Sequence, residues 1–441
     1  MSLPRYPSYK DSGVEWLGEV PGHWEVKRVR FVAELNPSKS ELSDLPRDTV
    51  VSFLPMDAIG EDGSLSLGKE KPISEVETGY TYFRNGDVAV AKITPCYENG
   101  KGALMQGLLH GVGFGTTELI VARPTADQVI GTYLHYLFIS PDFRGLGESH
   151  MYGAGGQKRV PDDFVRNFAT AFPPVVEQTQ IAAFLDRETA KIDALVAEQR
   201  RLMELLKEKR QAVISHAVTR GLNLDAHLKP SDIEWLGDVP EHWEVTRMAN
   251  IFREVAEPGS EDFPILSVSI HHGVSDKEMD DEELDRKVTR SDDRSKYKRV
   301  APDDLVYNMM RAWQGGFGTV RVEGMVSPAY VVARPKSSVV TEYIEHLLRT
   351  PKAIEQMRRH SRGITDFRLR LYWDEFKNLS AAVPPTKEAE AICEKISLMD
   401  EEFEALTAEA QRAIALLQER RTALISAAVT GQIDVRGAVA A

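Results

Sequence analysis

Two stretches of the chain have nearly the same sequence, and this internal repeat limits the possible folds more than any other feature. Residues 15–26 (EWLGEVPGHWEV) recur as residues 234–245 (EWLGDVPEHWEV), with ten of the twelve positions identical. Residues 208–219 (EKRQAVISHAVT) return as residues 419–430 (ERRTALISAAVT). The chain is therefore predicted to contain two copies of one structural unit.

The two copies agree at both ends and diverge in between. The first match is offset by 219 residues and the second by 211, so the interior of the second copy is eight residues shorter. One frame around two different interiors suits a protein that needs a single scaffold and two recognition surfaces. A duplication kept only for stability is the alternative. Short anchors in the interiors pair residues 113–116 with 316–319, 121–124 with 332–335, Asp163 with Asp374, and Asn167 with Asn378.

The formal net charge of −13 argues against a protein that coats DNA without regard to sequence, because phosphate contacts need positive charge. The charges are segregated, however. Acidic residues cluster at 276–285 and 400–409, and basic residues cluster at 290–299 and 358–370. Since binding depends on where charges lie, a bounded DNA-binding surface remains compatible with this sequence.

Membrane and disulfide signals are both missing from the sequence. There is no apolar run long enough to cross a bilayer, and the first residues lack the apolar core of a signal peptide. The two cysteines, Cys96 and Cys393, lie far apart and have no metal-ligand spacing, so we expect free thiols. These features predict a cytoplasmic protein with no membrane partner.

Each copy begins with a segment that predicts a mixed α/β globule. Runs rich in β-branched residues and bounded by Gly, Pro or Asp predict strands. Short helices are expected near 133–139 and 343–349, each ending before a proline. The predicted strands lie at 49–54, 87–91 and 118–122 in the first copy and at 263–269, 304–307 and 329–333 in the second.

Each copy ends in a long segment of strong helix formers, and the first of them (177–219) contains neither Pro nor Gly. Such a helix of about 43 residues would extend ~64 Å. Residues at every seventh place indicate a coiled-coil seam, so we expect the two helices to pair antiparallel. The predicted seam residues are Leu185, Ile192, Gln199, Leu206 and Val213, with Leu195, Leu202 and Lys209 at the second seam position, and in the other copy Ile396, Phe403, Ala410, Leu417 and Leu424, with Leu406, Ala413 and Arg420.

Two segments resemble the specificity subunits of Type I restriction-modification enzymes. They are residues 9–24 (YKDSGVEWLGEVPGHW) and residues 173–181 (PPVVEQTQI), the second of which runs into the long helix. The resemblance covers essentially the whole chain, including the order of its parts. It implies an α+β fold with two mixed α/β target-recognition domains in tandem, separated by two long helices that pair as an antiparallel coiled coil. The implied division is a first domain over 1–175, a central helix over 176–221, a second domain over 222–386, a C-terminal helix over 387–432 and a tail over 433–441.

The same resemblance implies a function. Each domain would recognise one half of a bipartite, asymmetric site in double-stranded DNA, and the helices would set the gap between the halves. Two methyltransferase subunits would dock on this scaffold with S-adenosylmethionine, and restriction (translocase) subunits would join with ATP and magnesium. No cofactor is expected in this chain itself.

The motifs of DNA-modifying enzymes are absent from the sequence, which predicts a noncatalytic chain. An amino-methyltransferase needs an Asn/Asp-Pro-Pro-aromatic tetrapeptide, but the Pro-Pro pairs here occur in FPPV (172–175) and VPPT (383–386). The glycine cluster at 111–115 is better explained by a turn than by a cofactor loop.

Candidate DNA-contacting residues lie in glycine-containing, basic segments of each copy. Arg recognises guanine, Gln recognises adenine, and Lys and Arg also contact phosphates. For any single residue, a solvated surface role is the alternative. The candidates are Lys92, Lys101, Gln157, Lys158 and Arg159 in the first copy, and Arg311, Gln314, Arg362, Arg368 and Arg370 in the second. The rival function for the whole chain is a coiled-coil adaptor that holds protein partners without sequence-specific DNA binding.

Overall fold

The computed structural model describes residues 3–154, 156–260, 262–270, 273–278, 296–363 and 369–438. Most of the acidic cluster at 276–285, part of the basic cluster at 290–299 and the candidate Arg368 therefore lie outside the described residues. The chain divides into two compact units. Unit 1 consists of Met1–Gln199 with Gln411–Ala441, and unit 2 consists of Arg200–Ala410.

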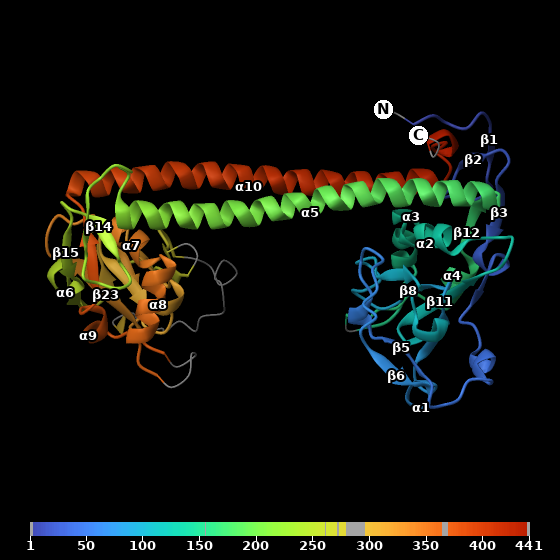
Figure 1. Ribbon diagram of the computed structural model, residues 1–441, viewed down its shortest axis with the longest axis horizontal. Helices are drawn as coiled ribbons and strands as arrows, with labels where there is room; N and C mark the ends of the chain where they lie inside the picture. Colours follow the sequence, from blue (N-terminus) through green and yellow to red (C-terminus); the bar gives the residue numbers. More distant parts are fainter. Residues whose placement is uncertain are drawn as a thin grey trace. The chain divides into compact units, whose positions relative to one another are not determined.

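Unit 1 has its globular part in the first copy, and its strands form two main sheets within the described residues (Figure 1). The first sheet has the order β4-β11-β8-β9, formed by Ala33–Leu35, Leu119–Pro124, Val88–Ala91 and Gly102–Leu104. The second has the order β6-β5-β10-β7, formed by Glu70–Pro72, Val50–Leu54, Val112–Gly115 and Thr81–Arg84. Two short ladders pair β1 (Tyr9–Asp11) with β2 (Glu19–Pro21) and β3 (Glu25–Arg28) with β12 (Ala169–Phe172). The helices are α1 (Ile73–Val76), α2 (Gly131–Ile139), α3 (Pro141–Ser149) and α4 (Asp162–Asn167).

Unit 2 contains the second copy, and its described residues repeat the first of these two sheets. Its main sheet has the order β16-β23-β20-β21, formed by Phe252–Val255, Tyr330–Pro335, Leu305–Asn308 and Phe317–Thr319. The remaining ladders pair β13 (Leu228–Pro230) with β14 (Asp238–Pro240), β15 (Glu244–Arg247) with β24 (Ser380–Val383), β17 (Val268–Ser269) with β18 (Gly273–Val274), and β19 (Lys298–Val300) with β22 (Gly324–Val326). The helices are α6 (Met248–Ile251), α7 (Thr341–Leu348), α8 (Pro351–His360) and α9 (Trp373–Phe376).

The predicted strands and short helices are found with small shifts at their ends, except the strand at 263–269, where only Val268–Ser269 is a strand. Sequence reasoning also overlooked α3 and α8, each of which begins at a proline. Pro141 and Pro351 start a second helix because proline fits the first helical turn, where no backbone N–H is needed.

One of the predicted anchors pairs strands that are not equivalent. Residues 317–319 form β21, which pairs with β20 as β9 pairs with β8. Residues 112–115 form β10 of the other sheet. The shared letters GFGT therefore lie at different places in the two units, and the counterpart of β21 is β9.

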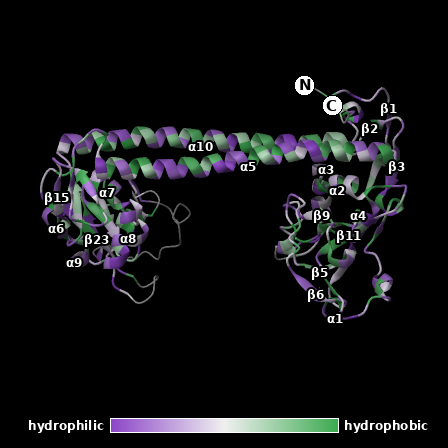
Figure 2. Ribbon diagram, viewed as in Figure 1, coloured by the Kyte–Doolittle hydropathy of each residue, from purple (hydrophilic) through white to green (hydrophobic). Residues whose placement is uncertain are grey.

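Two long helices complete the units: α5 (Val175–Arg220), of 46 residues, and α10 (Thr386–Val429), of 44 residues. Hydrophobic and hydrophilic residues alternate along both, as Figure 2 shows. None of the described helices is both long and apolar enough to cross a membrane.

Burial along these helices confirms the first predicted seam position and contradicts the second. Leu195 is 52% exposed, Leu202 is 43% exposed and Leu406 is 42% exposed. Lys209 and Arg420 are exposed as well, and Ala413 is half-buried. The second position of the buried stripe lies one residue further along. It consists of Thr189, Val196, Met203, Arg210 and Ala217 on α5, and of Asp400, Thr407, Ile414, Arg421 and Ala428 on α10.

Each unit packs the end of the long helix of one copy against the globular part of the other copy. In unit 1, the Tyr133 hydroxyl of α2 donates to the carbonyl of Val429 over 3.2 Å. In unit 2, the Tyr343 hydroxyl of α7 donates to the carbonyl of Val218 over 2.8 Å. Gly431 and Gly221 follow these helix ends with φ of +75° and +79°, a conformation that glycine adopts without strain.

Candidate nucleic-acid interface

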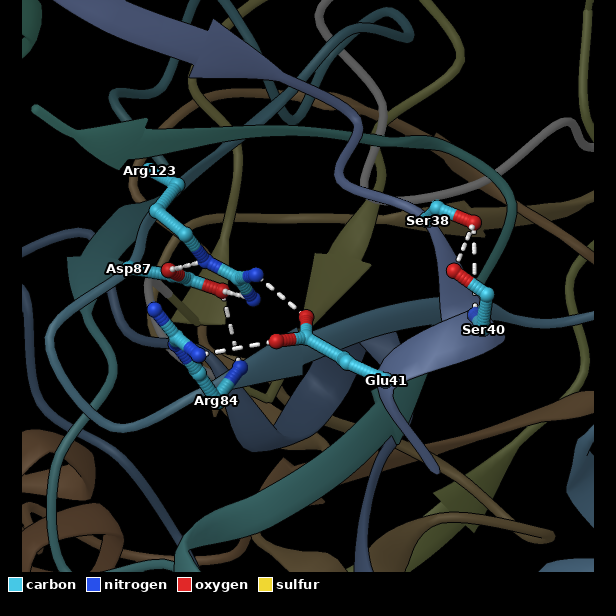
Figure 3. A network of polar contacts seen from close by, with 6 residues as sticks. All are labelled: Ser38, Ser40, Glu41, Arg84, Asp87 and Arg123. Atoms are coloured by element: carbon cyan, nitrogen blue, oxygen red, sulfur yellow. Dashed lines mark hydrogen bonds and ion pairs between the residues drawn. The ribbon is translucent and has the colours of Figure 1, made fainter. Parts of the chain in front are cut away.

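A buried ion-pair network lies at the start of the central strand β8 in unit 1 (Figure 3). Nε and Nη2 of Arg123 on β11 donate to the Asp87 carboxylate over 2.7 and 2.8 Å, and Nη1 donates to Glu41. The Asp87 carboxylate also accepts the backbone N–H of Arg84 over 2.8 Å. All three guanidinium nitrogens of Arg123 thus donate hydrogen bonds to carboxylates of the protein.

Unit 2 contains the same network. Nε and Nη2 of Arg334 on β23 each donate to Asp304 over 2.9 Å, and Nη1 donates to Glu257 over 2.7 Å. Asp87 and Asp304 directly precede β8 and β20. The network is therefore part of the shared frame, and the opposite ends of these two strands lead into the candidate loops.

Unit 1 places all five of its candidate residues on two neighbouring loops, residues 92–101 and residues 150–154 with 156–160. The carbonyl of Lys92 accepts the N–H of Val160 over 2.8 Å, and the carbonyl of Lys158 accepts the N–H of Thr94 over 2.9 Å. Gln157 and Lys158 are exposed. Lys92 Nζ lies 3.9 Å from Asp162, which is a long ion pair.

Two further unit 1 candidates have internal partners. Nε and Nη2 of Arg159 donate to Glu118 over 2.9 and 2.8 Å, and hydrogen bonding to Arg159 lowers the pKa of Glu118. Lys101 Nζ donates to the carbonyl of Met56 over 3.0 Å, so its ammonium group is turned to the protein backbone. Glu118 was not foreseen, because it is 41 residues away from Arg159 in the chain.

Unit 2 places its described candidates on the equivalent two loops, residues 309–316 and residues 361–363 with 369–372. Met309 and Leu371 are joined by a backbone hydrogen bond of 2.9 Å. Arg311 is half-buried and Gln314 is exposed on the first loop. Arg362 forms an ion pair with Glu375, and Arg370 is exposed. An open pocket of about 600 Å³ lies here, lined by Arg362, Gly363, Arg370, Tyr372, Asp374 and Glu375.

Backbone pairing reveals which arginines correspond in the two units. Tyr152 and Arg159 exchange hydrogen bonds of 3.1 and 2.9 Å, and Arg362 and Arg370 exchange two bonds of 2.9 Å. Arg159 and Arg370 are therefore equivalent positions. They differ by 211 residues, the same offset as the helix ends.

A buried tyrosine anchors the first loop of unit 1. Tyr97 is fully buried, and its hydroxyl donates to the carbonyl of Phe143 over 3.0 Å. The guanidinium of Arg144 lies over the Tyr97 ring and donates to the carbonyls of Tyr97 and Phe138. Burial lowers the pKa of Arg144 to about 10. The contacts of the buried Tyr97 side chain thus hold the centre of the loop.

Replacing Gly147 by alanine should loosen this loop, because an added Cβ would lie 1.8 Å from the Tyr97 hydroxyl oxygen. We expect a loss of about 1–3 kcal/mol in unfolding free energy, as for other overpacked sites. Hydrogen exchange of peptides covering residues 92–101 measures the effect. Gly145→Ala in the same helix is the matched control, because its Cβ would meet no atom within 4 Å. Equal exchange in the two variants would contradict the anchor.

The described residues hold no group of three or more His, Cys, Asp or Glu side chains arranged to bind a metal ion. Cys96 and Cys393 are free thiols, as predicted.

Comparison with known proteins identifies relatives of this chain. No protein-family model matches it. The chain is 43% identical over 198 residues to the Type I restriction enzyme EcoAI specificity subunit of Escherichia coli, and 41% identical over 188 residues to the EcoEI specificity subunit of the same organism. The matches cover 43% and 42% of this chain. They span only 33% and 31% of the two relatives, about a third of their length.

Two solved structures share the fold. The HsdS subunit from Thermoanaerobacter tengcongensis matches 93% of this chain and 98% of its own, with a TM-score of 0.53 and 17% identity. A chain from a structure concerned with complex assembly and conformational transition of the type I R-M system matches the same shares, with a TM-score of 0.63 and 18% identity. The sequence matches confirm the resemblance that the repeated motifs indicated, and the chain is a relative of the specificity subunits of Type I restriction-modification enzymes.

Proposed function

We propose that the chain is the noncatalytic specificity subunit of a Type I restriction-modification complex and that it recognises a bipartite, asymmetric site in double-stranded DNA. The observation that carries the proposal is the repeated pair of loops. Each unit presents two neighbouring loops at the end of the same central strand, β8 or β20, and the side chains on these loops differ between the units.

The chemistry of the loops suits DNA. Unit 1 presents Gln157, Lys158 and Arg159, and unit 2 presents Gln314 and Arg370. Arginine and glutamine donate to base edges in the major groove, and lysine contacts phosphates without regard to sequence. Because the two sets differ, the two half-sites would differ as well.

The frame around the loops would act as the scaffold. We propose two target-recognition domains in tandem, with α5 and α10 paired as an antiparallel coiled coil that sets the gap between half-sites. The Asp193–Arg421 ion pair in unit 1 and the Arg210–Asp400 ion pair in unit 2 support this pairing. Arg421, Arg210 and Asp400 occupy the second position of the buried stripe, and Asp193 lies next to it.

The reaction itself would belong to partner subunits. Two methyltransferase subunits would bring S-adenosylmethionine, and restriction (translocase) subunits would use ATP and magnesium. The role proposed for this chain is to select the DNA site and to hold those subunits on it.

A footprint of the assembled complex tests the proposal. The chain is purified with its methyltransferase subunits, and protected DNA is mapped on a random-sequence library. Two short protected tracts separated by a fixed gap are expected. Protein assembly with no sequence preference would overturn the proposal in favour of the coiled-coil adaptor. Arg370→Ala serves as an internal control, because it should alter one tract and leave the other unchanged.

A further inference from the structure

We propose that Arg159 recognises a guanine in the half-site of unit 1 and that Glu118 is the positioning residue that holds it for this contact. The inference rests on the proposed function and names one base and two residues that determine it. Arg159 was a candidate from sequence for DNA contact in general. The base that Arg159 would recognise and the role of Glu118 are inferred from the structure.

The first step is the geometry of the ion pair. Glu118 accepts from Nε and Nη2 of Arg159, which is one edge of the planar guanidinium group. No hydrogen bond among the described residues involves Nη1. The end of the group, formed by Nη1 and Nη2, therefore keeps two parallel N–H donors. The Arg159 side chain is 36% exposed, so these donors are accessible to a ligand.

The second step is the contrast with the arginines of the frame. Arg123 and Arg334 place the same two nitrogens on an aspartate, but each also gives Nη1 to a glutamate. Those two guanidinium groups have no free nitrogen. Arg159 has the same bidentate contact without the third partner, which is the arrangement expected of an arginine held in position for an external acceptor.

The third step compares Arg159 with its equivalent in unit 2. By the 211-residue offset, the counterpart of Glu118 is Ala329, which has no carboxylate. Arg370 is exposed, and among the described residues its Nη2 lies 4.0 Å from the sulfur of Met310. The two units thus carry the same arginine at the same place on the backbone, and among the described residues a carboxylate holds its guanidinium group only in unit 1.

The fourth step is the choice of ligand. Guanine presents two acceptors, O6 and N7, in the major groove, and they match two parallel N–H donors. Adenine presents a donor beside N7 and would oppose them. The Glu118 carboxylate also offsets the positive charge of Arg159, which weakens attraction to a phosphate but leaves the directed N–H donors intact. A guanine edge is therefore favoured over a phosphate.

Base selection by the complex of this chain with its methyltransferase subunits tests the inference. Libraries bound by the unchanged protein, Arg159→Lys, Glu118→Gln and Arg370→Lys are sequenced. Arg159→Lys should lose about 10- to 100-fold of the preference for guanine at one position of one half-site, because lysine cannot make the bidentate contact. Glu118→Gln should weaken the preference at that same position. Arg370→Lys should leave that position unchanged.

Replacing that guanine by 7-deazaguanine separates base recognition from a purely structural role. Loss of N7 should weaken binding by the unchanged protein, and it should cost Arg159→Lys little more. Unchanged base preferences in Arg159→Lys would overturn the inference. So would a lower salt dependence of binding with unchanged preferences, which would indicate a phosphate contact. If the unchanged protein selects no sequence at all, the proposed function itself fails.

Discussion

Inserting seven residues into both α5 and α10, after Gln199 and after Ala410, should abolish recognition of the original site and select a site with a longer gap. Seven residues preserve the phase of the buried stripe and add ~10.5 Å to each helix. That length corresponds to about three base pairs. Because the proposed function requires both half-sites to be bound at once, we expect the original site to lose at least ~100-fold in affinity.

The measurement uses a set of DNA duplexes in which only the gap between the half-sites is varied. The control is a five-residue insertion at the same two places, which turns the buried stripe by roughly 140° and should destabilise the helices. A seven-residue variant that still prefers the original gap would show that α5 and α10 do not set the spacing.

Asp87→Asn should destabilise unit 1 by about 3–5 kcal/mol, the usual effect of breaking a buried ion pair. Asp87 is 1% exposed, and it holds both Nε and Nη2 of Arg123. The amide keeps the volume of the side chain but loses its charge and turns an N–H group toward the arginine. Arg123 would keep Glu41 as its remaining carboxylate.

Hydrogen exchange resolved by peptide is the appropriate measurement, because the two units need not unfold together. Faster exchange is expected in β8 and β11. Asp304→Asn is the matched variant and should produce the same change in β20 and β23, because Asp304 holds Arg334 in the same way. If neither variant changes exchange in its own sheet, the shared network does not stabilise the frame.

Sequence periodicity located the long helices but could not settle which side of them is buried. A seven-residue repeat allows the second buried position to lie three or four residues after the first. Leu195 and Leu202 lie three residues after Ile192 and Gln199 and therefore favour the spacing of three, yet both side chains are exposed. The stripe instead includes Arg210 and Arg421, whose charges are paired with Asp400 and Asp193. Only the contacts between helices reveal such charge compensation.

Short repeated motifs also did not reliably identify which strands of the two units are equivalent. The GFGT letters at 113–116 and 316–319 suggested one strand, but their hydrogen-bond partners place them in different ladders. The 211-residue offset, by contrast, relates Arg159 to Arg370 correctly, as the loop bridges show. A residue offset that persists over a long stretch of the chain therefore identified equivalent residues better than a short identical motif.

The internal repeat, the mixed α/β globules, the long helices and the basic candidate loops were determined by the sequence alone, because hydrophobic periodicity and repeated motifs are local properties. The tertiary structure decided which arginines are already paired and which keep free donors. The sequence does not distinguish the contacts of Arg123 from those of Arg159. In the structure, Arg123 donates to carboxylates from three nitrogens, whereas Arg159 donates from two. Their partners, Asp87, Glu41 and Glu118, are brought to them only by the folding of distant segments.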